Sequence, residues 1–438
     1  MKMDWQNCFW ERDQKQAATH QVLVAGDFFP EGNLEPISIR NPKALYDDLL
    51  PLIQSPDLRI VNLEAPLSER GIPIAKDGPK MRIKPSAVAG LAEVPFDLAC
   101  LANNHVMDYG TTGLQDTLDC LSQRGIRSVG AGLTPEKAFA PVILEARGLR
   151  LGIVNFCEGE DGTGSSSGPG TFGWEPDRVI RAVSELIGKA DIVMVIAHVG
   201  REYAPVPPPY VQRLFRSIAE AGADLIVGHH PHVPQGFEIH SGTPIIYSLG
   251  NFIFEPWGST FIHRGMLLSV GMGEGAVSNF RLIPYTIDDK GIHGLAPHER
   301  VWFFEQLRSA SDVLADPDQV REAWNALIDS FGDSFWRRKA GEKTESAGLL
   351  PRFSWPWVGS LFRRAHSSQI DDHEIHRIRN TFVTPAHQNL IADGLARLAS
   401  GELGSSPQWA RDLVERWLHL EEPDLGPEAL REEKALHQ

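Results

Sequence analysis

Short apolar runs rich in Val, Ile and Leu alternate with amphipathic stretches from residue 21 to about residue 290. The runs that we predict to be strands are QVLVAG (21–26), LRIVNL (58–63), FDLACLA (96–102), LRLGIVNF (149–156), DIVMVIAH (191–198), ADLIVG (223–228) and PIIYSL (244–249). Between them, residues 111–125, 177–190 and 209–223 carry apolar side chains at i, i+3, i+4 and i+7, which predicts helices. This alternation is typical of a layered α/β domain.

The pattern changes near residue 300, where the strand-like runs stop and helical periodicity continues. One predicted helical face, within residues 321–338, is formed by Trp324, Leu327, Ile328, Phe331 and Phe335. Ser406 and Pro407 have the residue types of an N-cap and a first helical position before Trp409, Leu413 and Trp417. Residues 338–375 mix polar residues with Pro and Trp and predict a loop.

The chain has 438 residues, more than the roughly 250–300 at which single cores usually stop growing. We therefore expect a polar N-terminal extension (1–20), a main domain (21–298) and a helical accessory region (299–438) that contains the loop at 338–375. No internal repeat is evident.

Charge and cysteine usage limit the partners and the compartment. The formal net charge of −15 argues against nucleic acid and anionic membranes as general partners, because both are bound mainly through Lys and Arg. Cys8, Cys100, Cys120 and Cys157 form no CxxC pair, so reduced thiols are expected. We find no signal-peptide core and no run of 18 apolar residues, which predicts a cytoplasmic protein whose membrane contact is peripheral at most.

Polar residues that suit metal binding follow most of the predicted strands. They are Asp27 after the first strand, Glu64 after the second, Asn103, Asn104 and His105 after the third, His198 at the end of the fifth, and His229, His230 and His232 after the sixth. Ligands of open α/β sheets bind beyond the carboxyl ends of the strands, so these side chains are expected to meet. Carboxylates, an amide and imidazoles without thiolates fit two ions of the Mn, Fe or Zn type, bridged by a carboxylate.

The segments VAGDFF, VNLEAPLS, LANNHVMDYG, VIAHVGREY, GHHPHVPQGFEIHSG and IIYSLGNFIF occur in this order between residues 21 and 290. Together they resemble the motifs of the capsule-synthesis CapA family, also called the poly-γ-glutamate synthesis or PgsA-type proteins. That family is a branch of the calcineurin-like metallophosphoesterase superfamily. The resemblance implies a four-layer αββα metallophosphoesterase-like sandwich with a two-metal site at one edge, here followed by a C-terminal helical segment.

When the motifs are matched one by one, the resemblance implies a role for individual residues of this chain. Its metal ligands would be Asp27, Glu64 as the bridging carboxylate, Asn104, His198, His230 and His232, and the catalytic histidine would be His105. GHHPH has one residue more than the GHxH of the superfamily, so His229 could replace His230. Further candidates, as ligands or as partners of ligands, are His229, Glu202, Asn103 and Asn251.

The sequence leaves two functions open. One is a metal-dependent hydrolase of a phosphoester or an amide, acting on a small molecule or an anionic polymer in capsule or poly-γ-glutamate synthesis. The other is a non-catalytic metal-binding assembly factor within a polymer-synthesis complex. The opening DxH of the superfamily is reduced here to Asp27 followed by Phe28 and Phe29, which favours the second. The retained NNH and HHPH segments favour the first.

Overall fold

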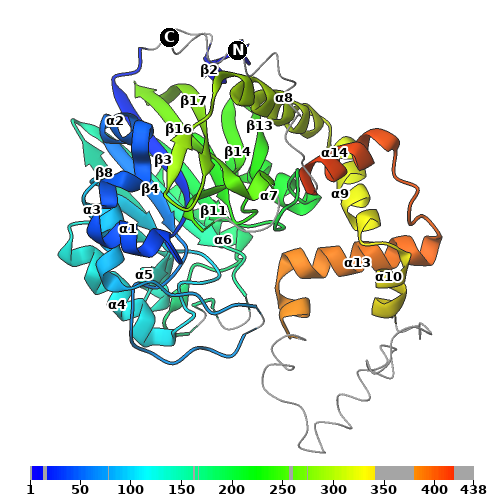
Figure 1. The fold of residues 1–438 in the computed structure, drawn as a ribbon, viewed down its shortest axis with the longest axis horizontal. Helices are drawn as coiled ribbons and strands as arrows, with labels where there is room; N and C mark the ends of the chain where they lie inside the picture. The colour runs from blue at the N-terminus through cyan, green and yellow to red at the C-terminus, as the bar shows by residue number, and fades with distance from the viewer. Residues whose placement is uncertain are drawn as a thin grey trace, which may run out of the picture.

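The computed structural model describes residues 2–12, 17–76, 78–160, 163–165, 167–255, 260–273, 275–340 and 379–418. Two large β-sheets lie face to face, and helices cover their outer faces (Figure 1). The expected fold class, a layered α/β sandwich followed by C-terminal helices, is confirmed.

The larger sheet contains ten strands in the order β1-β2-β17-β16-β3-β4-β5-β6, with β15 beside β3 and β18 beside β17. Its parallel strands are β3 (His20–Phe29), β4 (Leu58–Leu63), β5 (Leu98–Cys100), β6 (Arg127–Val129) and β15 (Asn251–Phe254). Its antiparallel part consists of β1 (Lys2–Asp4), β2 (Phe9–Glu11), β16 (Arg264–Gly273), β17 (Ala276–Ile287) and β18 (Ile292–Gly294). The segment set apart as an N-terminal extension thus adds a hairpin to this sheet, with Trp10 buried against Phe280.

The smaller sheet has six strands in the order β13-β14-β12-β11-β9-β8. They are β8 (Val142–Ala146), β9 (Leu149–Cys157), β11 (Ile192–His198), β12 (Leu225–His229), β13 (Pro234–His240) and β14 (Thr243–Leu249). The central strands β9, β11, β12 and β14 are parallel, and β8 and β13 pair antiparallel at the edges. A two-stranded ribbon joins β7 (Ala131–Gly132) to β10 (Gly170–Thr171).

Hydrophobic burial defines the layers. Apolar side chains from both sheets, among them Val24, Ile60 and Val195, form one core, which continues beneath α6 (Pro176–Leu186), α7 (Pro209–Glu220) and α8 (Pro297–Leu314). A second core covers the other face of the larger sheet. Its helices are α1 (Leu34–Arg40), η1 (Pro42–Leu49), α2 (Leu50–Gln54), η2 (Pro85–Val88), α3 (Ala89–Ala92) and α4 (Gly110–Gln123). The short α5 (Pro135–Phe139) lies against β7 and β10, and η3 (Thr260–His263) leads into β16.

The C-terminal helices have a core of their own beside the sandwich (Figure 1). They are α9 (Pro317–Ser330), α10 (Asp333–Ala340), α13 (Pro385–Ser400) and α14 (Gln408–Leu418). The single helical face predicted for residues 324–335 is wrong, because α9 ends before Gly332, whose φ of 78° breaks the helix. Trp324 and Trp336 still pack in the same core.

Residues 341–375 of the predicted loop lie outside the described residues, whereas residues 338–340 end α10. In the described part of the chain, no helix is both long and apolar enough to cross a membrane.

Candidate metal centre

The carboxyl ends of strands from both sheets converge at one edge of the sandwich. Asp27 lies within β3, and Glu64 follows β4 directly. His198 is the last residue of β11, and His229 is the last residue of β12. The side chains of all four are buried, so the two sheets together enclose a polar site.

Gly26 allows this edge to form. A Cβ atom at residue 26 would lie 2.1 Å from the carbonyl oxygen of Gly250, which leaves no room for any side chain. The close approach brings β15 alongside β3 and pairs Asn251 with Asp27. In the Gly-Asp dipeptide, Gly26 therefore permits the close packing of β15, and Asp27 supplies a carboxylate to the site.

One half of the cluster surrounds Asp27. Its Oδ1 lies 3.2 Å from His229 Nδ1 and accepts a hydrogen bond of 2.8 Å from Asn62 Nδ2. Its Oδ2 lies 3.7 Å from His232 Nδ1. His232 Nδ1 is also 2.9 Å from Asn251 Oδ1, which orients the ring, and His232 Nε2 lies 3.7 Å from Glu64 Oε1.

The other half surrounds His198. Its Nε2 lies 3.2 Å from Glu64 Oε1, 2.9 Å from Asn104 Oδ1 and 3.1 Å from His230 Nδ1. Asn62 Nδ2 lies 3.3 Å from His198 Nδ1, so Asn62 contacts both halves.

Two groups of side chains have the geometry of a metal site, and they share one carboxylate. Asp27, Glu64 and His232 form one group, and Glu64, His198 and His230 form the other. In each group the ligand atoms lie within 4.8 Å of one another. Glu64 thus occupies the place expected of a bridging carboxylate.

Unsatisfied buried atoms support this fit. Within the described residues, both oxygens of Glu64, Oδ2 of Asp27 and both ring nitrogens of His229 are buried without a hydrogen-bond partner. Such burial costs free energy unless another group satisfies these atoms. Oxygen and imidazole donors suit divalent Mn, Fe or Zn.

The electrostatic state of the cluster agrees with cation binding. Burial and the Asp27 carboxylate raise the pKa of Glu64 well above its usual value. Burial opposes ionisation of Asp27 too, but His229 and His232 bring the pKa of Asp27 below its usual value. Burial and neighbouring imidazoles lower the pKa of His198 well below 6.5, so the ring is neutral at pH 7 and has a lone pair to offer.

The histidine turn has an unusual backbone. His230 and His232 have φ angles of 97° and 59°, which side-chain-bearing residues rarely adopt. Strain of this kind is retained at functional sites. The turn sends His229 toward Asp27 and His230 toward His198, so the two histidines between which the sequence left the choice open contact different halves of the cluster.

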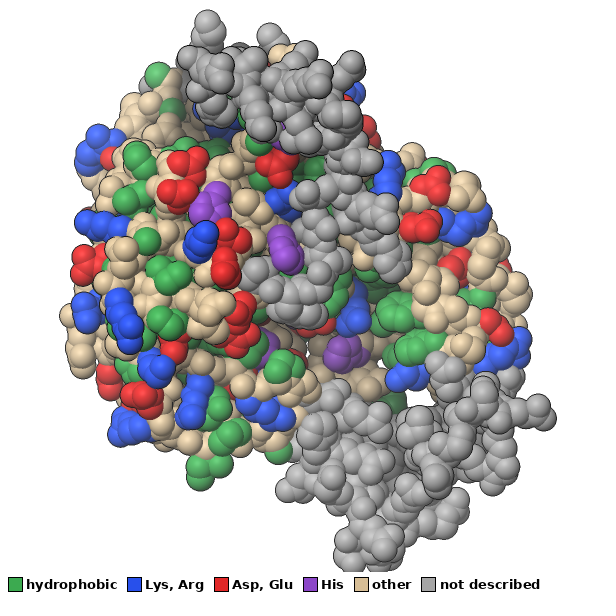
Figure 2. Space-filling model, in the orientation of Figure 1, with side chains coloured by type: hydrophobic (Ala, Val, Ile, Leu, Met, Phe, Trp, Pro, Cys, Tyr) green, Lys and Arg blue, Asp and Glu red, His purple; other side chains and the backbone are tan. Residues whose placement is uncertain are grey.

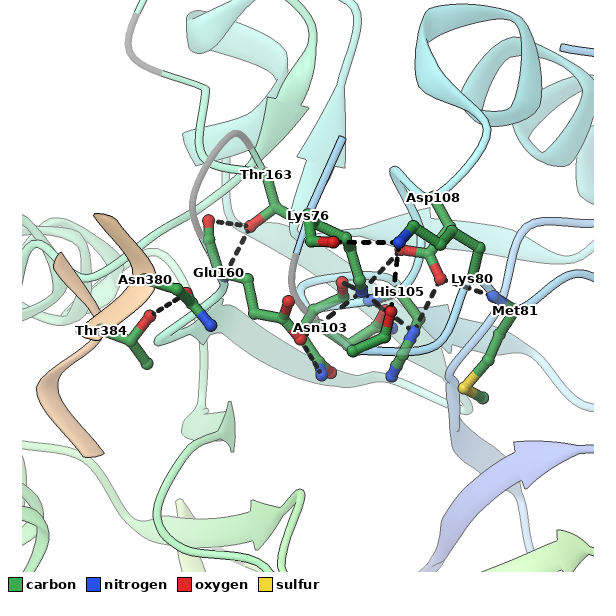
Figure 3. A network of polar contacts seen from close by, with 12 residues as sticks. Lys76, Lys80, Met81, Asn103, His105, Asp108, Glu160, Thr163, Asn380 and Thr384 are labelled. Atoms are coloured by element: carbon green, nitrogen blue, oxygen red, sulfur yellow. Dashed lines mark hydrogen bonds and ion pairs between the residues drawn. The ribbon is translucent and has the colours of Figure 1, made fainter. Parts of the chain in front are cut away.

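His105 belongs to a network of polar contacts with Lys76 and Asp108 (Figure 3). Its Nδ1 is 2.7 Å from Asp108 Oδ2 and 3.3 Å from Lys76 Nζ. Lys76 is completely buried, pairs with Asp108 Oδ1 at 2.7 Å and lies 3.5 Å from Glu160 Oε1. Burial and the Lys76 charge lower the pKa of His105 to about 4.

The remaining candidates hold other residues in place or line the opening. Asn103 Oδ1 accepts hydrogen bonds from the backbone N–H groups of His105 and Val106, and its amide donates to Leu63, so this side chain shapes the loop. Asn104 uses its amide nitrogen to donate to Glu160 and directs its oxygen at His198. Glu202 lines the cavities beside the cluster.

Sequence reasoning missed Asn62, Lys76, Asp108 and Glu160. Asp108 had a signal, because it stands three residues after His105 in the NNHVMD segment. Asn62 is the penultimate residue of β4, two positions before Glu64. Lys76 and Glu160 belong to loops without periodicity, and only the folded chain brings them to His105 and Asn104.

A cavity of about 540 Å³ opens beside the cluster. His105 and His232 line it together with Phe254 and the loop residues 78–81, and Glu31, Glu160 and Glu202 contribute carboxylates. Figure 2 shows histidine side chains near the hollow between the sandwich and the C-terminal helices. The cluster is therefore open to a ligand from this side.

Comparisons with known proteins identify relatives of the domain that carries the cluster. The family model described as "Bacterial capsule synthesis protein PGA_cap" matches residues 12–256. "PGA biosynthesis protein CapA" of Bacillus subtilis (strain 168) is 30% identical over 250 residues, 56% of this chain and 66% of that protein. "Capsule biosynthesis protein CapA" of Bacillus anthracis is 29% identical over 254 residues, 56% of this chain and 62% of that protein. The match spans a little under two thirds of the length of either relative.

A solved structure described as a novel phosphatase from Mycoplasma pneumoniae has 14% sequence identity and a TM-score of 0.41. The alignment covers 62% of this chain and 95% of that one.

Proposed function

Because the chain belongs to the bacterial capsule synthesis protein (PGA_cap) family, we propose that it is a metal-dependent hydrolase in the synthesis of a capsule, poly-γ-glutamate or a related anionic polymer. Its substrate would carry a phosphoester or an amide. It would work beside the polymer-synthesis machinery in the cytoplasm, with no nucleic-acid partner and at most peripheral membrane contact.

One observation carries the proposal. Two potential metal groups share Glu64, and His105 stands next to them without belonging to either. His105 lines the same cavity as His232, within reach of a ligand bound at the cluster. A metal site that served only the fold would have no need of this additional imidazole.

The proposed ligands are Asp27, Glu64, Asn104, His198, His230 and His232, with His229 as a further donor to the ion near Asp27. Divalent Mn, Fe or Zn ions, when bound, polarise a phosphoryl or acyl oxygen and lower the pKa of water. Glu64 and Asp27 supply the negative charge that holds the cations. Asn251 fixes the ring of His232, and Asn62 fixes the carboxylate of Asp27.

His105 is the proposed general acid of the reaction. Its Nδ1 donates a hydrogen bond to Asp108 Oδ2, and His105 lines the cavity, so Nε2 is the proposed atom that exchanges a proton with the leaving group. With a pKa of about 4, the protonated ring that acts as the acid is a minor form at pH 7. The carboxylate of Asp108 stabilises the protonated ring during this transfer.

A non-catalytic assembly factor is the second candidate, and Phe29 favours it. This buried side chain stands at the position of the histidine in the DxH of the superfamily, so position 29 offers no imidazole to the site. The His229 ring, 3.2 Å from Asp27, offers a replacement donor from β12. This donor compensates for the missing histidine, and the position of His105 remains the reason we favour hydrolysis.

Metal analysis combined with a substrate screen tests the proposal. Purified protein loaded with Mn²⁺ or Zn²⁺ is assayed on p-nitrophenyl phosphate, bis-p-nitrophenyl phosphate and γ-glutamyl p-nitroanilide. We expect bound metal and metal-dependent turnover of at least one class. Bound metal without turnover of any of the three would favour the assembly factor, and absence of metal binding would contradict both functions.

A further inference from the structure

The cavity beside the metal centre has a wall that comes from the C-terminal helices. Asn380 and His387 line the cavity of about 540 Å³ together with His105 and Glu160. His387 also lines a smaller pocket of about 40 Å³ beside His198 and His230. Figure 3 shows Asn380, on the C-terminal segment that leads into α13, beside Glu160.

A buried carboxylate attaches this wall to the metal domain. Glu158 Oε2 accepts a hydrogen bond of 3.1 Å from the backbone N–H of Ala386, in the first turn of α13. Glu158 Oε1 accepts hydrogen bonds from Tyr210 and from the backbone N–H of Gly200. The start of α13 is thus bound to the segment between His198 and Glu202, which itself borders the metal cluster.

The far end of α13 is fixed as firmly. Arg397 pairs with Asp329 of α9 at 3.0 Å, and both side chains are almost fully buried. Gly394 lies so close to Trp336 that a Cβ atom there would be 2.2 Å from the indole ring. The position of His387 at the cavity therefore follows from contacts at both ends of α13, and Asn380, which precedes the helix, is joined to its N-cap by the hydrogen bond from Thr384.

The family model matches residues 12–256, and α13 begins more than a hundred residues later. The metal ligands come from the matched segment, whereas this wall of the cavity does not. Because this wall lies outside the segment that supplies the ligands, its residues can change without altering the metal site. Loops that determine specificity vary in the same way on a scaffold that stays constant.

We propose that α13 completes the substrate cavity and that Asn380 and His387 are specificity-determining residues, which bind an uncharged polar part of the substrate next to its reacting group. Amide and imidazole side chains exchange hydrogen bonds with hydroxyl, amide and carbonyl groups. Three carboxylates, Glu31, Glu160 and Glu202, line this cavity against one ammonium group, Lys80, and this excess of negative charge disfavours a second anionic group here. The inference rests on the proposed function in that it takes this cavity as the substrate site.

Binding of two phosphates to the Mn²⁺-loaded protein, measured by titration calorimetry, tests the proposal independently of turnover. Inorganic phosphate reaches only the metal centre, whereas glucose 1-phosphate also presents hydroxyl groups to α13. We expect His387→Ala to weaken binding of glucose 1-phosphate about fivefold to tenfold, the effect of one lost hydrogen bond. The affinity of the His387→Ala variant for inorganic phosphate should stay within about twofold of that of the wild type.

Asn380→Ala should likewise weaken the binding of glucose 1-phosphate and leave that of inorganic phosphate nearly unchanged. Asn380 also accepts a hydrogen bond from Thr384, so His387→Ala decides the test if the Asn380 variant fails to fold. Gln388→Ala is the matched control, because Gln388 is exposed on the same turn of α13. This variant should bind both ligands as wild type does.

Three results would overturn the inference: equal weakening of both ligands by His387→Ala, no weakening of either, or a wild-type protein that does not bind glucose 1-phosphate more tightly than phosphate. A protein that binds both phosphates with the expected difference but hydrolyses no ester would refute the proposed catalysis and leave the role of α13 in place.

Discussion

Glu64 carries two buried oxygens, and among the described residues neither has a hydrogen-bond partner. A carboxylate in this position raises the free energy of the metal-free fold, as its raised pKa also indicates. The positive φ angles of His230 and His232 add backbone strain at the same place. Cation binding would satisfy the buried oxygens of Glu64, and the strained turn would hold His230 and His232 toward the cation.

Removing one ligand should therefore lower metal affinity without unfolding the protein. We expect Asp27→Asn and His232→Ala to reduce bound Mn²⁺ or Zn²⁺ severalfold, because each change removes an anionic or imidazole donor. Elemental analysis after metal loading and dialysis measures this. His240→Ala is the matched control. His240 lies on the edge strand β13 and pairs with Glu220 of α7, not with a residue of the cluster. Equal metal content in all three variants would contradict the ligand assignment.

Lys76 is a residue-scale feature of a different kind, because its single buried ammonium group lies within 3.5 Å of two carboxyl groups, those of Asp108 and Glu160. Lys76→Met would leave Asp108 and Glu160 without this partner, and we expect a loss of about 3–5 kcal/mol in the free energy of unfolding. The double variant Lys76→Met/Asp108→Asn should recover part of it.

Lys80→Met is the control for Lys76 in urea unfolding followed by tryptophan fluorescence. The ammonium group of Lys80 donates to the backbone oxygens of Lys76 and Gly78, so its loss should cost less than about 1 kcal/mol. Similar losses for Lys76→Met and Lys80→Met would show that the ion pairs of Lys76 do not carry the effect.

At the scale of elements, Glu158, the residue that follows β9, contacts α13, and this contact depends on the ionisation of its carboxyl group. Burial raises the pKa of this carboxyl group from 4.5 to about 7, although Tyr210 and two backbone N–H groups act against the shift. The folded protein holds the proton more tightly than the unfolded chain does. The contribution of Glu158 to stability is therefore complete below about pH 4.5 and is lost as the pH rises toward about 7.

Glu158→Gln should remove this pH dependence. Between pH 5.5 and pH 8, the free energy of unfolding of the wild type should fall about 1–2 kcal/mol more than that of the variant. Urea unfolding at the two pH values measures the difference, and Glu185→Gln, at an exposed position on α6, should behave as wild type. Parallel curves for wild type and Glu158→Gln would contradict a raised pKa.

Element boundaries also show what local sequence decides. The apolar run at residues 191–198 predicted β11, because a short buried run of β-branched residues has few alternatives inside an α/β domain. The single helical face predicted through Phe331 and Phe335 was wrong, because apolar periodicity alone does not indicate that Gly332, with its positive φ angle, ends the helix. Periodicity located the elements, and one glycine decided where a helix ended.

For the whole molecule, the sequence predicted the fold and the edge at which the polar residues gather. Periodicity predicted a layered α/β domain with polar residues at the carboxyl ends of its strands, and the resemblance of the motifs implied the two-sheet sandwich. Periodicity marked candidate site residues in or shortly after the predicted strands, as with Asp27 and His198, and the resemblance implied their roles. Lys76 reaches His105 from a loop, and Glu160 and His387 reach the cavity from a loop and from a helix more than a hundred residues away; no local pattern marks such contacts.

The central claim, catalysis at this metal centre, is tested most directly by His105→Ala, measured for metal content and turnover in the same preparation. Because His105 belongs to neither metal group, we expect metal content to stay near that of wild type. Turnover of a substrate with a poor leaving group should fall by roughly 10²–10⁴-fold, and turnover of an activated aryl ester should fall much less, because such a group leaves without a proton. Loss of metal equal to that of Asp27→Asn, or turnover unchanged from wild type, would contradict the account.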